Sequence, residues 1–318
     1  IEGLIGVDNY IINVSVNAGI AIYHKHADSF EELLKNADVA KYKATEKRSK
    51  YEVYDKAMND AIVERLHLGN SLKMALENKE FMLYYQPQYR TKDKKIIGFE
   101  ALIRWKSESM GIVSPGRFIP VAEETGLIIP LGDWILEEAV KFIKSIHGQG
   151  YPDMIISVNI SGIQLIQDDF SDKVAGVLEK YDLDSDYLEL EITESVMMES
   201  MDSVINNINR LREMGVSIAL DDFGTGYSSL NYLTKIPINT LKIDKSFIDN
   251  IGIMDEKDSL ISSIVDIGQR LGLSIVAEGV ETEEQFKYLA QKRCERIQGY
   301  FFSKPLPQDS VFDLLKEQ

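Results

Sequence analysis

The chain has 318 residues, of which 44% are hydrophobic and 27% charged, and a formal net charge of −16 at pH 7. This composition is typical of a globular protein with one large domain and a fragment, or with two modest domains. The negative charge argues against binding a nucleic-acid polymer or an anionic membrane, because both would repel the chain. The single cysteine, Cys294, excludes an internal disulfide and a cysteine zinc site and favours a reducing, cytoplasmic compartment. No apolar run reaches the length of about 18 residues that a membrane-spanning helix needs.

The first 54 residues predict a strand, a helix and a second strand. Residues 11–23 are rich in β-branched side chains, residues 30–47 carry apolar side chains at helical spacing, and residues 51–54 predict a short strand. Such a unit is too small to bury a core alone, so we expect residues 1–54 to complete a domain that begins upstream. The opening Ile1-Glu2-Gly3, without a start methionine, also suggests a piece of a longer protein. A charged helical connector is predicted over residues 55–75.

Residues 76–318 predict an α/β fold, a TIM-like (β/α)₈ barrel. Apolar runs predict strands at residues 81–88, 96–105, 155–161, 187–193, 217–222, 240–244, 274–279 and 296–302. Most of them are separated by amphipathic helical stretches, and residues 118–146 predict two helices. Only a short charged turn, residues 90–95, separates the first two strands, which leaves no room for a crossover helix. The first strand is therefore expected to be antiparallel.

Polar side chains recur in these segments where a short β-branched run ends. They are Glu100, Asn159, Glu191, Asp221, Asp222, Lys242, Glu278 and Gln298. In a parallel barrel the carboxyl ends of the strands meet at one mouth, so residues far apart in sequence are expected to converge there. Oxygen-rich clusters of this kind hold Mg²⁺ or Mn²⁺, and the pattern predicts a metal-dependent enzyme.

Longer segments carry a family resemblance. They read EALIRW from Glu100, then PGRFIPVAEETGLI, VNISGIQ, ELEITES, DDFGTGYSSL, LKIDKSF, VAEGVET and IQGYFFSKPLP. In this order they resemble the EAL-domain family, the phosphodiesterases of cyclic di-GMP. Residues 1–54 resemble the C-terminal half of a GGDEF domain, with SVNAGIAIY, LLKNADVAKYKA and YEVYD. The nucleotide-binding hairpin of that domain would lie upstream, so we expect no cyclase activity from this chain.

The resemblance implies a role for each site residue. The metal ligands would be Glu100, Asn159, Glu191, Asp221, Asp222 and Glu278. The catalytic group would be Lys242, which orients the attacking water, with Glu278 or Glu281 as general base and Gln298 completing the shell. Substrate contacts would come from Gln86, Glu100, Leu102 and Arg104. Glu194 would anchor the loop at residues 223–229, the expected control point.

The implied activity is hydrolysis of cyclic di-GMP to linear 5′-pGpG, which would end a second-messenger signal. Two Mg²⁺ or Mn²⁺ ions would be the cofactors, and Ca²⁺ would inhibit because its coordination is larger and looser. A homodimer through the barrel domain is expected. Two other readings remain: a receptor that binds cyclic di-GMP without cutting it, and an enolase-like lyase with Lys242 as base.

Each residue also has a simpler interpretation. Glu100 could cap a strand at the surface, Asn159 could support a turn, and Asp221-Asp222 could mark a helix entry. Glu194 could be a carboxylate at a helix N-terminus, and Lys242 could serve as a salt-bridge partner inside the barrel. Trp105, Phe118 and Trp134 are predicted core residues, and Cys294 and the four histidines are predicted to be inert.

Overall fold

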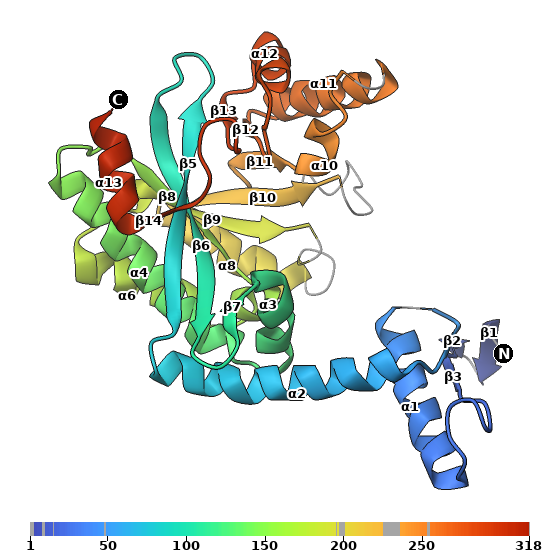
Figure 1. The fold of residues 1–318 in the computed structure, drawn as a ribbon. Helices are drawn as coiled ribbons and strands as arrows, with labels where there is room; N and C mark the ends of the chain where they lie inside the picture. The colour runs from blue at the N-terminus through green and yellow to red at the C-terminus, as the bar shows by residue number, and fades with distance from the viewer. Residues whose placement is uncertain are drawn as a thin grey trace. The chain divides into compact units, whose positions relative to one another are not determined.

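The computed structural model describes residues 3–7, 10–14, 16–47, 49–194, 196, 201–224, 236–252 and 255–317 (Figure 1). The chain divides into two compact units, residues 1–72 and residues 73–318. Helix α2, Lys56–Glu77, crosses the division. None of the helices in the described part of the chain combines the length and the apolar character that a membrane span requires.

The first unit contains two small sheets and a helix. Strands β1, Gly3–Val7, and β2, Tyr10–Val14, pair antiparallel, whereas β3, Ala18–Ile20, pairs in parallel with β4, Tyr51–Val53. Helix α1, Phe30–Glu46, connects β3 to β4 and starts where the Ser29 side chain accepts a hydrogen bond from the Glu32 amide. The prediction of one strand over residues 11–23 is wrong, because β2 and β3 take different partners. Strand propensity does not reveal where a chain changes partner.

The second unit is a closed barrel of eight strands within the described residues. Its strands are β5 Phe81–Arg90, β6 Ile96–Ser107, β8 Ile155–Asn159, β9 Leu188–Thr193, β10 Ser217–Phe223, β11 Thr240–Ile243, β12 Ser274–Ala277 and β13 Arg296–Ile297. They pair in the order β5-β13-β12-β11-β10-β9-β8-β6, and β6 returns to β5. Strand β5 is antiparallel to both neighbours and the other pairs are parallel, so the predicted barrel and its antiparallel first strand are confirmed. Two short strands flank it: β7 Gly111–Val113 pairs with β6, and β14 Leu306–Pro307 with β5.

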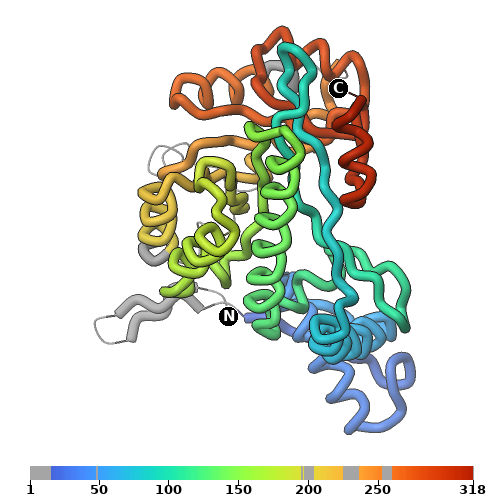
Figure 2. Tube along the Cα trace, turned by 90° about the vertical axis from the view of Figure 1, so that its left-hand side faces the viewer, coloured from blue at the N-terminus to red at the C-terminus, as the bar shows by residue number. Residues whose placement is uncertain are grey.

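Helices cover the outside of the barrel (Figures 1 and 2). They are α3 Pro115–Glu124, α4 Ile128–Gly148, α5 Gly162–Leu165, α6 Phe170–Tyr181, α8 Met201–Glu213, α10 Lys245–Ile248, α11 Asp255–Arg270, α12 Glu283–Gln291 and α13 Gln308–Lys316, with a 3₁₀ turn at Ser185–Tyr187. The two helices predicted between β6 and β8 are α3 and α4. Figure 2 shows α4, in green, running beside the strands, and it packs on β5, β6 and β8.

The predicted aromatic core lies where these helices meet the first two strands. Trp105 and Phe118 are completely buried and meet edge to face with ring centroids 5.5 Å apart. Trp134 is half-buried and packs against Phe81 at 6.2 Å. The indole Nε1 of Trp105 donates to Glu80 Oε2 at 2.8 Å, so the entry to β5 is held by the strand that bears Glu100.

Candidate active site at the carboxyl mouth of the barrel

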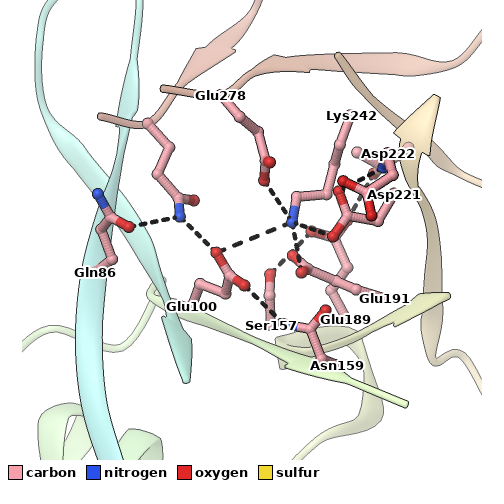
Figure 3. A network of polar contacts seen from close by, with 12 residues as sticks. Gln86, Glu100, Ser157, Asn159, Glu189, Glu191, Asp221, Asp222, Lys242 and Glu278 are labelled. Atoms are coloured by element: carbon pink, nitrogen blue, oxygen red, sulfur yellow. Dashed lines mark hydrogen bonds and ion pairs between the residues drawn. The ribbon is translucent and has the colours of Figure 1, made fainter. Parts of the chain in front are cut away.

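A buried lysine lies at the centre of the predicted cluster (Figure 3). Lys242, in β11, is 0% exposed. Its Nζ lies 2.5 Å from Glu191 Oε2 and 2.6 Å from Glu278 Oε1. The same nitrogen lies 3.3 Å from Asp221 Oδ2 and 3.9 Å from Glu100 Oε2. Four carboxylates from β6, β9, β10 and the residue after β12 therefore surround one ammonium group, so the expected convergence of these residues is observed.

Two amides bond to Glu100, and one of them connects the cluster to β5. Asn159 Nδ2 donates to Glu100 Oε1 at 2.7 Å, and Gln298 Nε2 donates to Glu100 Oε2 at 2.5 Å and to Gln86 Oε1 at 3.2 Å. Gln86 in turn donates to the Ser303 carbonyl at 3.2 Å. Glu100 is thus held from both sides, and Gln86 belongs to this polar chain inside the barrel (Figure 3).

A bulge at the end of β10 brings two consecutive aspartates to the same site. The pairing of β10 with β11 shifts register between Leu220 and Phe223, and Asp222 has a φ of +54°. A positive φ at a residue other than glycine stores strain and is typical of functional sites. The Asp222 amide donates to Asp221 Oδ1 at 2.9 Å, and Figure 3 shows the two side chains beside each other. Strand alternation alone would point them to opposite faces.

The start of the following loop is tied to Glu194. The amide of Gly224, the second residue of that loop, donates to Glu194 Oε2 at 3.5 Å. Gly224 has a φ of +95°, and a Cβ at this position would lie 2.6 Å from the Phe247 ring. Only glycine fits both conditions. Residues 225–229 of the predicted control loop lie outside the described residues.

Burial and mutual repulsion dominate the electrostatics of the cluster. Burial raises the pKa of Glu191 well above its ordinary value, and the neighbouring Glu100 adds to this effect. Burial also raises the pKa of Glu278 to about 8, although Lys242 opposes the change. Burial works to lower the pKa of Lys242, but its carboxylate neighbours outweigh burial and raise that pKa well above the ordinary value. Carboxylates in excess over one cation raise one another's pKa values, which is the environment that attracts a further cation.

The donor set suits a hard divalent ion. Glu191 Oε1 and Gln298 Oε1 are buried and have no hydrogen-bond partner among the described residues. A buried acceptor without a partner costs free energy, and a cation or its bound water would satisfy it. In the part of the chain that the structure describes, no three carboxylates, histidines or cysteines are spaced to hold an ion together. Lys242 Nζ instead occupies the space between the carboxylates.

Two other predicted residues lie beside the cluster. Leu102 and Arg104 line a cavity of about 300 Å³ together with Asn159, Ile119 and Glu123. The guanidinium of Arg104 lies over the Tyr84 ring at 5.5 Å, and its Nη1 donates to the Ile103 carbonyl at 2.9 Å. Residues from α3 and β6 give this cavity apolar walls, and Asn159, which donates to Glu100, also lines it.

Glu281 pairs with a different lysine from the carboxylates that surround Lys242. Its carboxylate lies 2.9 Å from Lys245 Nζ and is 44% exposed, and Lys245 also pairs with Asp249 at 2.7 Å. Glu278, in contrast, contacts Lys242 directly. Of the two candidate general bases, the geometry favours Glu278.

Sequence reasoning missed a second polar layer beneath the site. Arg296 pairs with Glu189 inside the barrel at 3.0 Å, and Thr240 contacts both. The signal was present: these residues stand two positions before Gln298, Glu191 and Lys242. On a strand, such residues share a face.

Comparisons with known proteins identify relatives of this chain. The family model described as EAL domain matches residues 69–305. Signaling protein YkoW of Bacillus subtilis is 41% identical over 313 residues, which are 98% of this chain and 39% of that protein. The bifunctional diguanylate cyclase/cyclic di-GMP phosphodiesterase MucR of Pseudomonas aeruginosa is 38% identical over 306 residues, 96% of this chain and 45% of that protein. A solved structure titled PaMucR Phosphodiesterase, c-di-GMP complex matches with a TM-score of 0.74 and 40% identity, covering 77% of this chain and 99% of that one. The chain thus spans less than half the length of these two curated relatives.

Proposed function

The chain belongs to the EAL domain family, and we propose that it hydrolyses one phosphodiester bond of cyclic di-GMP to give linear 5′-pGpG. The observation that carries the proposal is the convergence of Glu100, Glu191, Asp221 and Glu278 on Lys242 at the barrel mouth. The related MucR is named a bifunctional diguanylate cyclase/cyclic di-GMP phosphodiesterase, and the similar PaMucR structure is described as a c-di-GMP complex.

We assign the cofactor as two divalent ions, Mg²⁺ or Mn²⁺. The ligands would be Glu100, Asn159, Glu191, Asp221, Asp222 and Glu278, with Gln298 completing the shell. The unpartnered oxygens of Glu191 and Gln298 support this assignment. When bound, such ions polarise the phosphate and lower the pKa of the attacking water. Ca²⁺ is expected to inhibit, because it prefers longer bonds and more ligands.

Lys242 would act on the attacking water. Its ammonium is held at the mouth by contacts with Glu191 at 2.5 Å and Glu278 at 2.6 Å. Entry of cations would relieve the carboxylates of their shared dependence on Lys242 and free its N–H groups for the water. Glu278, which contacts the same nitrogen, would take up the proton.

The dinucleotide would lie across the mouth with one half in the cavity of about 300 Å³ beside β6. The apolar walls of Leu102 and Ile119 suit a purine, and Arg104 would turn to a phosphate through two parallel hydrogen bonds. Gln86 would support the same end through Gln298, to which it is hydrogen-bonded at 3.2 Å.

Incubation of the purified chain with cyclic di-GMP and Mg²⁺, followed by chromatography of the nucleotides, tests the proposal. The expected result is conversion to pGpG, lost when a chelator is added and suppressed by Ca²⁺. Tight binding without product would favour the receptor reading. If the chain neither binds cyclic di-GMP nor forms a product, both the phosphodiesterase and the receptor interpretations are excluded.

Residues 1–54 are proposed to be the C-terminal part of a GGDEF-like domain, residues 55–75 a helical connector and residues 76–318 the phosphodiesterase domain. The alignment with YkoW includes 98% of this chain, so it extends over the first unit as well. A homodimer through the barrel domain completes the proposal.

A further inference from the structure

Beneath the proposed metal ligands, the barrel contains a layer of polar side chains. Each member stands two residues along the chain from a member of the site, on the side away from the mouth. The pairs are Gln88 with Gln86, Ser157 with Asn159, Glu189 with Glu191, Thr240 with Lys242, and Arg296 with Gln298. Two residues along a strand correspond to about 6.6 Å, so this layer lies directly below the site.

All three guanidinium nitrogens of Arg296 donate hydrogen bonds to other members of the layer or to Ser274. Nη1 donates to Glu189 Oε1 at 3.1 Å and to Gln88 Oε1 at 3.4 Å. Nη2 donates to Glu189 Oε2 at 3.0 Å and to Thr240 Oγ1 at 2.7 Å, and Nε donates to Ser274 Oγ at 3.3 Å. One side chain on β13 therefore bonds to β5, β9, β11 and β12.

Glu189 completes the network from the opposite wall. Its Oε1 accepts from Ser157 Oγ at 3.1 Å and its Oε2 accepts from Thr240 Oγ1 at 2.6 Å. The residue is 2% exposed, and Arg296 is 8% exposed. Both carboxylate oxygens and the whole guanidinium thus have partners, which is the condition under which a buried ion pair is tolerated.

A cavity of about 1080 Å³ opens on the other side of this layer, at the amino ends of the strands. Glu189, Thr240 and Arg296 line it, and the β5–β6 turn contributes Arg90 and Lys94. The ion pair therefore separates an open cavity from the site above. The hydrogen bonds of Arg296 therefore connect strands across the barrel at this level, in addition to the backbone bonds between neighbouring strands.

We propose that Arg296, with Glu189, is a positioning residue for the site: its side-chain bonds hold β9, β11 and β13 at fixed distances across the barrel. Both residues lie one layer below the proposed ligands and line the cavity at the amino ends of the strands. A buried ion pair adds little net stability compared with apolar residues of similar volume, so its value lies in directional bonds that apolar residues lack. Displacement of reacting groups by about 1 Å lowers a rate by about 10²-fold, which makes such bonds important for catalysis. The inference rests on the proposed function.

The test replaces the pair by apolar residues in the Glu189→Leu/Arg296→Met double variant. We expect a melting temperature close to the parent, kcat reduced by at least about tenfold, and KM for cyclic di-GMP changed by less than about threefold. The dissociation constant for Mn²⁺, measured by calorimetry without substrate, should rise by about fivefold or more, because Glu191 and Lys242 lose their fixed spacing.

Two further variants keep the result unambiguous. Arg296→Lys retains the charge opposite Glu189 but cannot reach four strands, so its Mn²⁺ affinity and kcat should fall between those of the parent and the double variant. Val174→Ala removes packing from a fully buried position on α6, outside the barrel interior, and should lower the melting temperature with kcat and Mn²⁺ affinity unchanged.

Parent-like kcat and Mn²⁺ affinity in the folded double variant, or in Arg296→Lys, would overturn the inference. Failure of the proposed function has a different signature: the parent itself would form no pGpG. The Mn²⁺ measurement still decides the inference in that case. A parent that binds no Mn²⁺ would refute the metal site and the positioning role together.

Discussion

A lysine that is completely buried among four carboxylates, as Lys242 is, persists only because its partners compensate the loss of water. The same partners would repel one another without it. Lys242 therefore has two roles in the proposal: it stabilises the cluster before ions enter, and it orients the water afterwards.

Replacing Lys242 by Met should lower kcat by at least about 10²-fold with little change in KM, because the side chain acts on the water and not on the dinucleotide. Without metal, the Lys242→Met variant should also melt at a lower temperature than the parent. Addition of Mg²⁺ should raise the melting temperature of the variant by more than it raises that of the parent. Steady-state kinetics and thermal melting check both statements. A variant whose only defect is a raised KM would contradict the role.

Replacing Glu100 by Ala should abolish turnover, since it removes a ligand that Asn159 and Gln298 hold at 2.7 and 2.5 Å. Binding of cyclic di-GMP should survive, because the cavity beside Arg104 is unchanged. The matched control is Glu108→Ala in the exposed β6–β7 turn, which should keep the parent rate. Turnover by Glu100→Ala above about a tenth of the parent rate would show that the ligand assignment is wrong.

Cys294 is predicted to be unreactive while the protein is folded. Burial raises the pKa of its thiol to about 12, and its Sγ contacts the carbonyls of Ile275 and Arg296. Only the thiolate reacts, so a maleimide at about pH 8 should leave the native chain unlabelled and label it fully in guanidinium chloride. Mass spectrometry distinguishes the two. Rapid labelling of the native chain would show that the β12–β13 region opens.

At the scale of elements, the end of β10 concentrates features that a regular strand lacks. A register shift, a positive φ at Asp222 and a glycine pressed against Phe247 occur within a few residues. The Glu194 side chain, from the end of β9, holds the Gly224 amide. This bond connects the geometry of the loop to that of the aspartates before it.

Replacing Glu194 by Ala should lower activity by about tenfold or more and raise the Mg²⁺ concentration needed for half-maximal rate, with the fold intact. The carboxylate no longer fixes Gly224, so Asp222 loses its strained conformation. Glu194→Gln, which keeps an acceptor oxygen, should recover part of the rate. Circular dichroism confirms folding, and an unaltered Mg²⁺ dependence in Glu194→Ala would exclude the anchor role.

At the scale of the whole molecule, the chain combines a closed barrel with a separate unit joined through α2. We predict a homodimer through the barrel, in which association sets the geometry of the loop after β10. Light scattering should give about twice the chain mass of 36.0 kDa, with and without substrate. A monomer with full activity would eliminate coupling between association and turnover but would leave the metal chemistry standing.

The sequence by itself determined where the apolar runs of the barrel strands give way to polar residues. Alternation and β-branched runs report local burial, and a parallel barrel brings all strand ends to one mouth, so Glu100, Glu191, Asp221 and Glu278 could be grouped without coordinates. The short turn between β5 and β6 likewise determined the antiparallel start, because chain length alone excludes a crossover there.

Only the tertiary structure decided which side chains contact one another. That Lys242 lies among four carboxylates, that Glu281 pairs with Lys245, and that Arg296 bonds to Glu189 depend on the register between strands distant in sequence. The change of partner between β2 and β3 depends on the same kind of information. Local patterns specify which face of a strand is buried, whereas register is set by the closure of the barrel as a whole.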